Sequence, residues 1–257
     1  MIELKFSDEE YLIFISTSKE IVGIKNINDN NSDIDGLLFI DNQKNILIKN
    51  TISFLKGKKF NNAFLWGEKG MGKSSLIKSA IDFVKKKEKE KVLLLEILSH
   101  DLKFLPEIIH KLSNIKKKFI IFIDDITLSS KSSEFSILKV LVQGSILSNN
   151  KNIVFYVTSN LRSLVKSSSN YYKNELEIKD KESSLASLAE RFGLKLGFHK
   201  CNKEEYQEII KFYFKKYNIK CSEQNIKQAL TWSIKKGGFS GRVAQQFAIN
   251  MVSKIYS

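Results

Sequence analysis

The part of the sequence best suited to chemistry is a glycine-rich octapeptide, Gly67-Glu68-Lys69-Gly70-Met71-Gly72-Lys73-Ser74, which matches G-x-x-x-x-G-K-[ST] in full. Glycines let the backbone curl until successive N–H groups point at phosphate oxygens, and a following helix adds the positive end of its dipole. Lys73 is expected to reach the β- and γ-phosphates of a nucleotide, and the Ser74 hydroxyl to ligate Mg²⁺. The predicted nucleotide-binding loop comprises Gly67, Glu68, Lys69, Gly70, Met71, Gly72, Lys73, Ser74 and Ser75.

The residues on either side of the octapeptide favour a phosphate loop over an accidental match. An apolar run at residues 63–66 enters it as a strand would. Residues 74–84 then repeat apolar side chains at helical spacing. A strand–loop–helix unit is the context in which this pattern binds phosphate.

Two carboxylates follow a second apolar run, residues 119–123, as they do in proteins that pair a phosphate loop with an acidic strand end. Asp124 is expected to hold Mg²⁺, directly or through a water, and Asp125 to orient or deprotonate the attacking water. Many ATPases of this class carry glutamate at the second position, and aspartate is one methylene shorter. The alternative is an ordinary acidic pair at a strand end.

Three further side chains are candidates for contact with the γ-phosphate. Asn160 follows the apolar run 153–157 and could bridge the γ-phosphate and the water, although Thr-Ser-Asn is also common in turns. Arg242 is a candidate for sensing the γ-phosphate, and Arg191 for reaching a neighbouring subunit's site as an arginine finger. A guanidinium keeps its charge and forms forked bonds to phosphate oxygens, but a surface salt bridge is the alternative for each arginine.

The elements that must position these residues form two units. Apolar runs at residues 63–66, 92–97, 119–123 and 153–157 alternate with helical segments, which indicates a parallel sheet buried on both faces and a three-layer α/β core. Beyond residue 200 we predict a small helical domain of three helices, with Asn202 and Ser222 as N-caps. The last helix is expected to bury one apolar face formed by Ala244, Phe247, Ala248, Met251, Val252 and Ile255.

These patterns divide the chain into three parts. Residues 1–35 form an N-terminal segment whose fold the sequence leaves open, with a polar stretch at 26–35 that is typical of a linker. Residues 36–200 form the nucleotide-binding core, and residues 201–257 form the helical lid.

Composition points to a cytoplasmic protein. Cys201 and Cys221 are the two cysteines, so a disulfide framework is not expected, and no apolar run is long enough for a signal core or a membrane span. His199 and the cysteines lack the paired spacing of a zinc site. The formal net charge of +14 would attract nucleic acid. The alternative is a general bias in composition, because lysine is abundant throughout the chain and residues 85–91 alternate lysine with glutamate, as solvated helix ends do.

Across residues 36–252 the chain resembles the DUF815 family of predicted AAA+ ATPases. This resemblance implies a P-loop AAA+ core with a C-terminal helical lid, ATP in the cleft between them, and a ring or filament in which Arg191 completes a neighbour's site. Asp125 agrees with the family pattern. The matching stretches are Asn50-Thr51 with Phe54 and Gly57, Leu65-Trp66-Gly67 through Gly72-Lys73-Ser74-Ser75, Asp124-Asp125, Thr158-Ser159-Asn160, Arg191-Phe192-Gly193-Leu194, Leu196-Gly197-Phe198-His199 and Ser240-Gly241-Arg242-Val243-Ala244.

The sequence therefore predicts an ATPase that uses Mg²⁺ and drives a conformational change in a partner or in its own homo-oligomer. A loader or remodeller acting on DNA is a second hypothesis, and a slow ATP-dependent binding switch is a third. Kinase activity fits less well, because the paired aspartates, the sensor candidates and the lid all suit hydrolysis.

Overall fold

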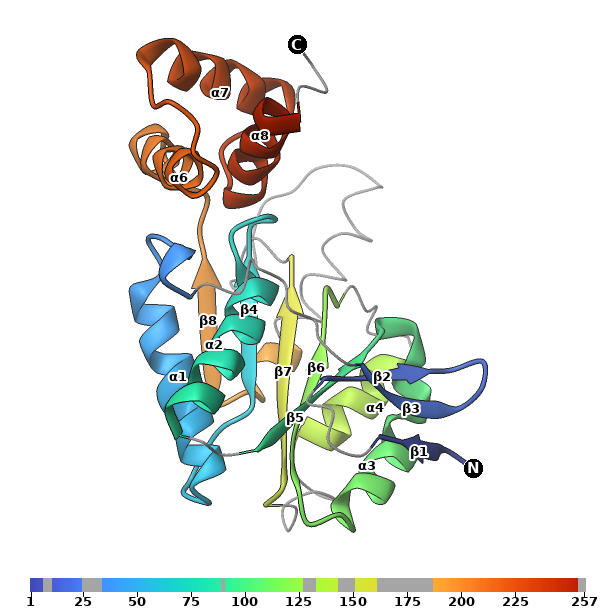
Figure 1. Cartoon of the computed structure of the whole chain (residues 1–257). Helices are drawn as coiled ribbons and strands as arrows, with labels where there is room; N and C mark the ends of the chain where they lie inside the picture. The colour runs from blue at the N-terminus through green and yellow to red at the C-terminus, as the bar shows by residue number, and fades with distance from the viewer. Residues whose placement is uncertain are drawn as a thin grey trace.

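The computed structural model describes residues 1–6, 11–24, 34–88, 91–126, 133–142, 151–160 and 187–253. They form an α/β core built on an eight-stranded sheet, with a cluster of three helices above the carboxyl ends of its strands (Figure 1). The strand order is β1-β3-β2-β5-β6-β7-β4-β8.

The centre of the sheet is parallel, as predicted. Adjacent strands run in the same direction and each begins near the same edge. Side chains alternate between the two faces, so Leu93 and Leu95 join one apolar cluster while Val92 and Leu94 join the other. These strands are β5 (Val92–Ile97), β6 (Lys118–Ile123), β7 (Ile153–Ser159), β4 (Ala63–Gly67) and β8 (Leu194–Phe198).

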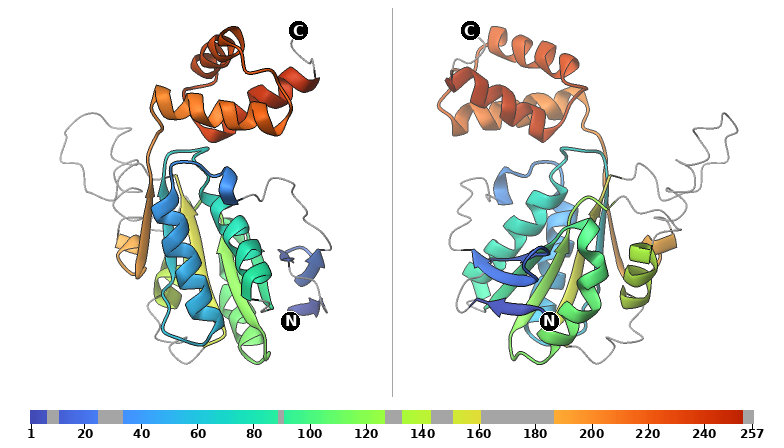
Figure 2. Two further views of the ribbon diagram at one scale, coloured as in Figure 1. Left: turned by 60° about the vertical axis from the view of Figure 1, so that its left-hand side comes forward. Right: turned by 90° about the vertical axis from the view of Figure 1, so that its right-hand side faces the viewer.

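Helices cover both faces of this sheet, which gives the predicted three layers (Figure 2). One face is packed by α1 (Asp41–Leu55) and α2 (Lys73–Glu88), through residues such as Phe54 and Leu76. The other is packed by α3 (Leu105–Ser113) and α4 (Ser133–Val142), through residues such as Ile108 and Leu138. Two 3-10 helices, η1 (Ile34–Gly36) and η2 (Ser99–Phe104), precede α1 and α3.

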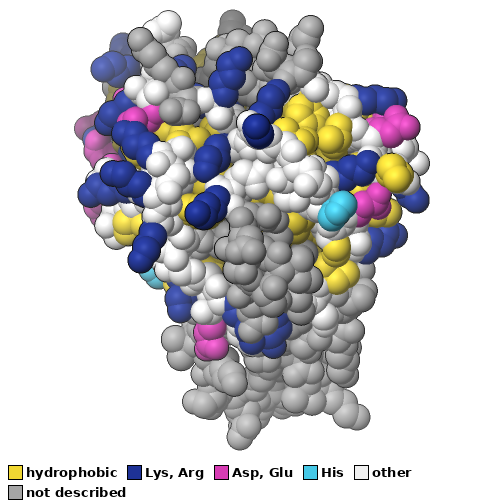
Figure 3. All heavy atoms as spheres, turned by 90° about the horizontal axis from the view of Figure 1, so that it is seen from below, with side chains coloured by type: hydrophobic (Ala, Val, Ile, Leu, Met, Phe, Trp, Pro, Cys, Tyr) yellow, Lys and Arg dark blue, Asp and Glu magenta, His cyan; other side chains and the backbone are white. Residues whose placement is uncertain are grey.

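The two ends of the parallel strands differ in chemistry. Their carboxyl ends face the helical cluster and carry the candidate site residues. Their amino ends face the opposite side of the core, which we call the lower face. Figure 3 shows Lys and Arg side chains spread over this face, with fewer acidic ones between them.

The N-terminal segment, whose fold the sequence left open, extends the same sheet. β2 (Tyr11–Ile15) pairs parallel with β5 and antiparallel with β3 (Glu20–Ile24), while β1 (Glu3–Lys5) pairs parallel with β3. Only four residues join β2 to β3, so a hairpin is the only pairing they allow, and this part of the sheet departs from the parallel pattern. Residues 25–33, most of the expected polar linker, lie outside the described part of the chain.

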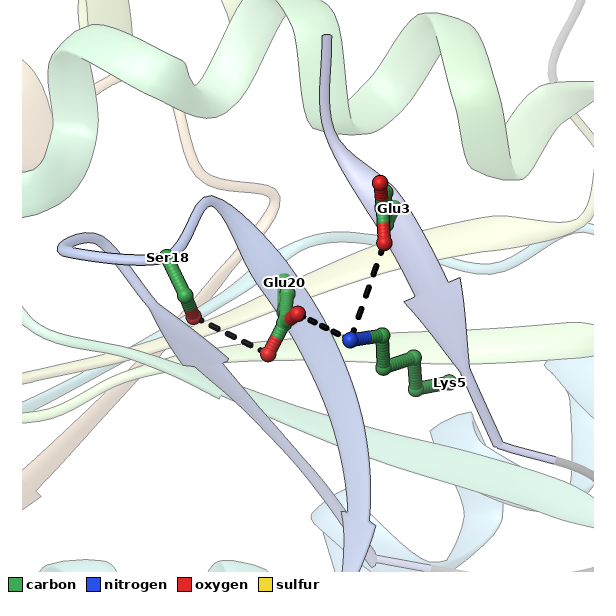
Figure 4. Close-up of polar contacts among 4 residues, drawn as sticks. All are labelled: Glu3, Lys5, Ser18 and Glu20. Atoms are coloured by element: carbon green, nitrogen blue, oxygen red, sulfur yellow. Dashed lines mark hydrogen bonds and ion pairs between the residues drawn. The ribbon is translucent and has the colours of Figure 1, made fainter.

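Strand β1 forms one edge of the sheet, and its three residues are exposed. Lys5 contacts Glu20 on β3 and lies 3.7 Å from Glu3, while Ser18 donates a hydrogen bond to Glu20 (Figure 4). Charged side chains on an edge strand oppose pairing with the edge of another sheet, so this end of the sheet is protected against aggregation.

The helical cluster contains α6 (Lys203–Lys216), α7 (Glu223–Lys235) and α8 (Gly241–Ser253). The predicted caps are confirmed: Asn202 forms a capping box with Glu205, and Ser222 accepts a bond from the backbone N–H of Asn225. We refer to these helices as the lid.

The apolar face predicted for the last helix is correct in part. Ala244, Phe247 and Ala248 are buried, and Met251 is half-buried. Val252 was wrongly assigned to this face, because it lies one position round the helix from Met251 and is 55% exposed. Ile255 lies outside the described residues.

Candidate functional site

The glycine-rich loop leaves β4 at Gly67 and ends where α2 begins at Lys73. Gly67 has a φ of 127°, and a Cβ there would lie 2.0 Å from the carbonyl oxygen of Phe198. The next residue, Glu68, donates its backbone N–H to that same oxygen at 2.9 Å. Only glycine meets both demands, so β8 fixes the start of the loop.

The Lys73 ammonium lies inside the curl of this loop. It donates hydrogen bonds to the carbonyl oxygens of Gly67 at 2.8 Å and Glu68 at 2.7 Å, and to Asn160 Oδ1 at 3.0 Å. Burial lowers the pKa of Lys73 to about 8, although the nearby Asp125 and Asp124 favour the charged form. The amine is therefore held where its charge has little solvent to stabilise it, a position suited to an anionic ligand.

Asp124 connects the loop helix to the neighbouring strand. Its Oδ1 accepts a bond from Ser74 Oγ at 2.6 Å and another from Thr158 Oγ1 at 2.5 Å. A hydroxyl and a carboxylate that converge in this way form an oxygen-rich partial shell, which suits Mg²⁺ when ligand phosphates and waters supply the rest. Within the described residues, no group of three or more His, Cys, Asp or Glu side chains could hold a metal ion.

Asp125 and Asn160 lie side by side at the ends of adjacent strands. Asn160 Nδ2 donates to Asp125 Oδ1, while its Oδ1 accepts from Lys73. Asp125 has a φ of 49°, and its backbone N–H is held by Thr158 Oγ1 at 2.8 Å. Asn160 thus bridges the lysine of the loop and the carboxylate expected to handle water.

Arg242 reaches the same cavity from the lid. Its backbone N–H donates to Gly70 O at 3.2 Å, and its charge lies close enough to Lys73 to oppose that lysine's protonation. Gly70, with a φ of 73°, has no room for a Cβ, because one would lie 2.9 Å from Ser240 Oγ and 3.1 Å from Arg242 Cβ. The first turn of α8 is therefore seated directly on the phosphate loop.

These residues line one cavity of about 250 Å³ between core and lid. Its polar lining includes the loop, both aspartates, Thr158 and Asn160. Its apolar lining was not predicted from the sequence: Leu37 and Ile40 come from the segment before α1, and Ile209 and Tyr213 come from α6. These side chains could contact the nucleobase of a nucleotide whose phosphates lie on the loop.

Arg191 lies away from this cavity. It sits in a turn before β8, whose first residue, Leu194, pairs with Ala63 at the start of β4, whereas Phe198 pairs with Gly67 at the loop. Since the strand rises about 13 Å between those two residues, Arg191 is at the opposite end of β8 from the chain's own loop. Phe192 anchors the turn by packing on Phe64, with ring centroids 5.3 Å apart.

Sequence reasoning missed Thr158 as a site residue. It is 1% exposed and bonds to both aspartates, so it orients the acidic pair from the neighbouring strand. The signal was present, because Thr158 follows the apolar run 153–157 just as Asp124 follows its own run.

The family comparison covers nearly the whole chain. The model described as "Protein of unknown function (DUF815)" matches residues 10–255. No curated protein sequence matches the chain significantly. Within the described residues, none of the helices combines the length and the apolar character needed to cross a bilayer.

Solved structures show which fold this is. The Aeropyrum pernix ORC1 protein in complex with DNA is similar, with a TM-score of 0.61, 13% identity and coverage of 89% of this chain and 63% of that one. AMPPCP-bound DnaA from Aquifex aeolicus is similar with a TM-score of 0.54 and 15% identity, and the match covers 84% of this chain and 62% of that one. The Thermotoga maritima RuvB Holliday junction branch migration motor has a TM-score of 0.53 and 16% identity, and the match covers 87% of this chain and 66% of that one. The chain spans less than two thirds of each, and at these identities the likeness shows the AAA+ ATPase fold with its C-terminal helical domain.

Proposed function

Because the chain belongs to the DUF815 family and has the AAA+ fold, we propose that it binds Mg-ATP in the cavity between core and lid and hydrolyses it. The observation that carries this proposal is the continuous set of bonds from Lys73 through Asn160 to Asp125. It connects the group that would hold the γ-phosphate to the group that would handle the attacking water.

Each residue would have a separate task. The loop N–H groups and Lys73 would hold the phosphate chain, with Ser74 and Asp124 placed to hold Mg²⁺, which when bound offsets charge on the phosphate oxygens. Asp125 would orient the water or accept its proton, and Asn160 would fix the position of that carboxylate. Arg242 would contact the γ-phosphate from the lid, so that the presence of that phosphate changes how the lid sits on the core.

The position of Arg191 supports a homo-oligomer. It cannot reach the phosphate loop of its own chain, yet Phe192 holds it in an anchored turn. We propose that it acts in trans, stabilising charge that develops on the phosphate in a neighbouring copy.

Mixing two inactive variants tests both parts of the proposal. Asp125→Asn should bind ATP without turnover, and Arg191→Ala should also bind ATP and be inactive. In a mixture, some interfaces would pair an intact Arg191 with an intact Asp125, so ATPase activity should return. Lys73→Ala, which should not bind ATP, is the control. Turnover by Asp125→Asn alone would remove Asp125 from the chemistry, and activity independent of protein concentration would exclude a finger in trans.

A DNA-associated loader or remodeller is the second candidate. Two of the structural neighbours are described as a branch migration motor and as a complex with DNA, and this chain carries a formal charge of +14. Stimulation of ATP hydrolysis by DNA would favour it. Concentration-dependent turnover indifferent to DNA would favour a self-assembling ATPase with a protein client, and one slow turnover per binding event would favour a switch.

A further inference from the structure

The lower face of the core gathers lysines from four separate connections. Each of β4, β5, β6 and β7 is entered from a helix that ends at this face, because parallel strands all begin at the same edge. The connections are α1–β4, α2–β5, α3–β6 and α4–β7, which are distant in sequence but lead into four adjacent strands of the sheet (Figure 1). Their described lysines are Lys56, Lys58, Lys59, Lys91, Lys116, Lys117 and Lys151.

Four of these lysines have side chains that are not used in holding the fold together. Lys58, Lys59, Lys116 and Lys151 are exposed, and their ammonium groups form no ion pair or hydrogen bond with the described residues. Lys58 and Lys59 also lie beyond the C-cap of α1 at Lys56, and Lys116 lies beyond that of α3 at Asn114. We call these four the lower-face lysines.

Lysines outnumber acidic side chains in the same connections, where Glu90 is the one acidic residue of the segment between α2 and β5. The described residues in all four contain no Asp or Glu, and Glu88 at the end of α2 is paired with Lys56 at 2.7 Å. A uniform excess of lysine would mix the two charges, as α6 does where Lys211 contacts Glu208 at 2.6 Å. Lys and Arg side chains therefore predominate over acidic ones on the lower face (Figure 3).

We propose that the lower face binds the sugar–phosphate backbone of nucleic acid without reading base sequence. Four adjacent strands space these connections over a distance of about 14 Å, which equals the length of about four base-pair steps of duplex. A membrane surface fits less well, since binding there normally adds an apolar side chain inserted below the headgroups. None of the exposed large hydrophobic residues of the described chain lies in these connections.

This surface is separate from the nucleotide cavity, which opens at the opposite end of the strands. The inference therefore does not rest on the proposed ATPase. Nucleic-acid binding and ATP hydrolysis can fail independently, and a Lys73→Ala variant separates them, because it should retain the first and lose the second.

The test is fluorescence anisotropy with labelled duplex and single-stranded oligonucleotides of mixed sequence, between 50 and 200 mM salt. The variant Lys58→Gln/Lys59→Gln/Lys116→Gln/Lys151→Gln should bind duplex at least about tenfold more weakly at 0.1 M salt than the unaltered protein. The slope of log K against log salt should become shallower by up to about 3.6, since each lost phosphate contact contributes about 0.9. Basal ATPase activity should not change.

A matched control removes the same charge from the lid. Lys203, Lys220, Lys227 and Lys235 are exposed and unpaired within the described chain, and changing them to Gln lowers the net charge from +14 to +10, as the lower-face variant does. This control should bind nucleic acid nearly as the unaltered protein does. Equal weakening of both variants, an unchanged salt slope in the lower-face variant, or binding to phosphatidylserine vesicles without binding to either oligonucleotide would overturn the proposal.

Discussion

Thr158 offers the sharpest test of how Asp124 and Asp125 are held, because its one hydroxyl forms hydrogen bonds with both residues. Thr158→Val keeps the shape of the side chain but removes the donor to Asp124 and the acceptor for the backbone N–H of Asp125. Thr158→Ser keeps the hydroxyl and removes only a methyl group. Comparing the two variants separates the hydrogen bonds from the packing.

The two lost bonds set the expected magnitude. A hydrogen bond to a carboxylate contributes about 2 kcal/mol, and the N–H of Asp125, whose residue is exposed and open to water, adds about 1 kcal/mol. Thr158→Val should therefore lower the free energy of unfolding by about 3 kcal/mol. Thr158→Ser should cost about 1 kcal/mol, since it removes one buried methyl group.

Activity should follow the same order. In Thr158→Val, Asp124 keeps its bond from Ser74. We therefore expect weaker Mg²⁺ binding and slower ATP hydrolysis, but not complete loss of activity. Loss of a group that orients a metal-binding carboxylate typically costs about 10- to 100-fold in metal affinity or activity. Urea unfolding and the Mg²⁺ dependence of ATP hydrolysis measure the two effects. If the Val variant matched the Ser variant in both, the hydroxyl would have no role in holding the acidic pair.

Three other substitutions test the cavity and the core. Gly67→Ala should abolish nucleotide binding, because the added Cβ would clash with the Phe198 carbonyl oxygen. A fluorescent ATP analogue measures this binding. The control Gly57→Ala should still bind, since Gly57 also has a positive φ, 65°, but has open space around it. Arg242→Ala should reduce ATP turnover by about 10- to 100-fold, with little rescue by Arg242→Lys, which lacks the forked donor; normal turnover would remove Arg242 from the site. Burial raises the pKa of Tyr156 to about 12 from 10.0. Between pH 10 and 12 only the unfolded chain therefore loses this proton, and the free energy of unfolding falls as pH rises. In Tyr156→Phe the free energy of unfolding should fall by up to about 2.7 kcal/mol less across this range, as measured by urea titrations.

Much of the site could be predicted from the sequence because its parts are local. The phosphate loop is contiguous, and each glycine in it reflects a backbone demand that holds wherever the loop occurs. Asp124, Asp125 and Asn160 were found because each follows an apolar run, and parallel strands bring such ends to one edge. The helical cluster was found from its caps and its periodicity.

The parts that were missed depend on contacts between distant segments. Leu37 lies before α1 and Tyr213 lies in α6, and only the seating of the lid on the core brings them to one cavity. The N-terminal strands were missed for a related reason. Each is three to five residues long, and they join the sheet through the pairing of β2 with β5, which no local pattern reveals.

The bonds of Lys73 suggest how binding and hydrolysis are coupled. An ammonium has three donors, and all three are in use, on Gly67 O, Glu68 O and Asn160 Oδ1. A γ-phosphate oxygen must therefore replace at least one of them. The first two are main-chain oxygens of the loop, whereas Asn160 is a side chain and also donates to Asp125. Asn160 is the partner that can move with least cost, so a γ-phosphate oxygen would replace Asn160 Oδ1 at Lys73 while Asn160 Nδ2 continues to hold Asp125.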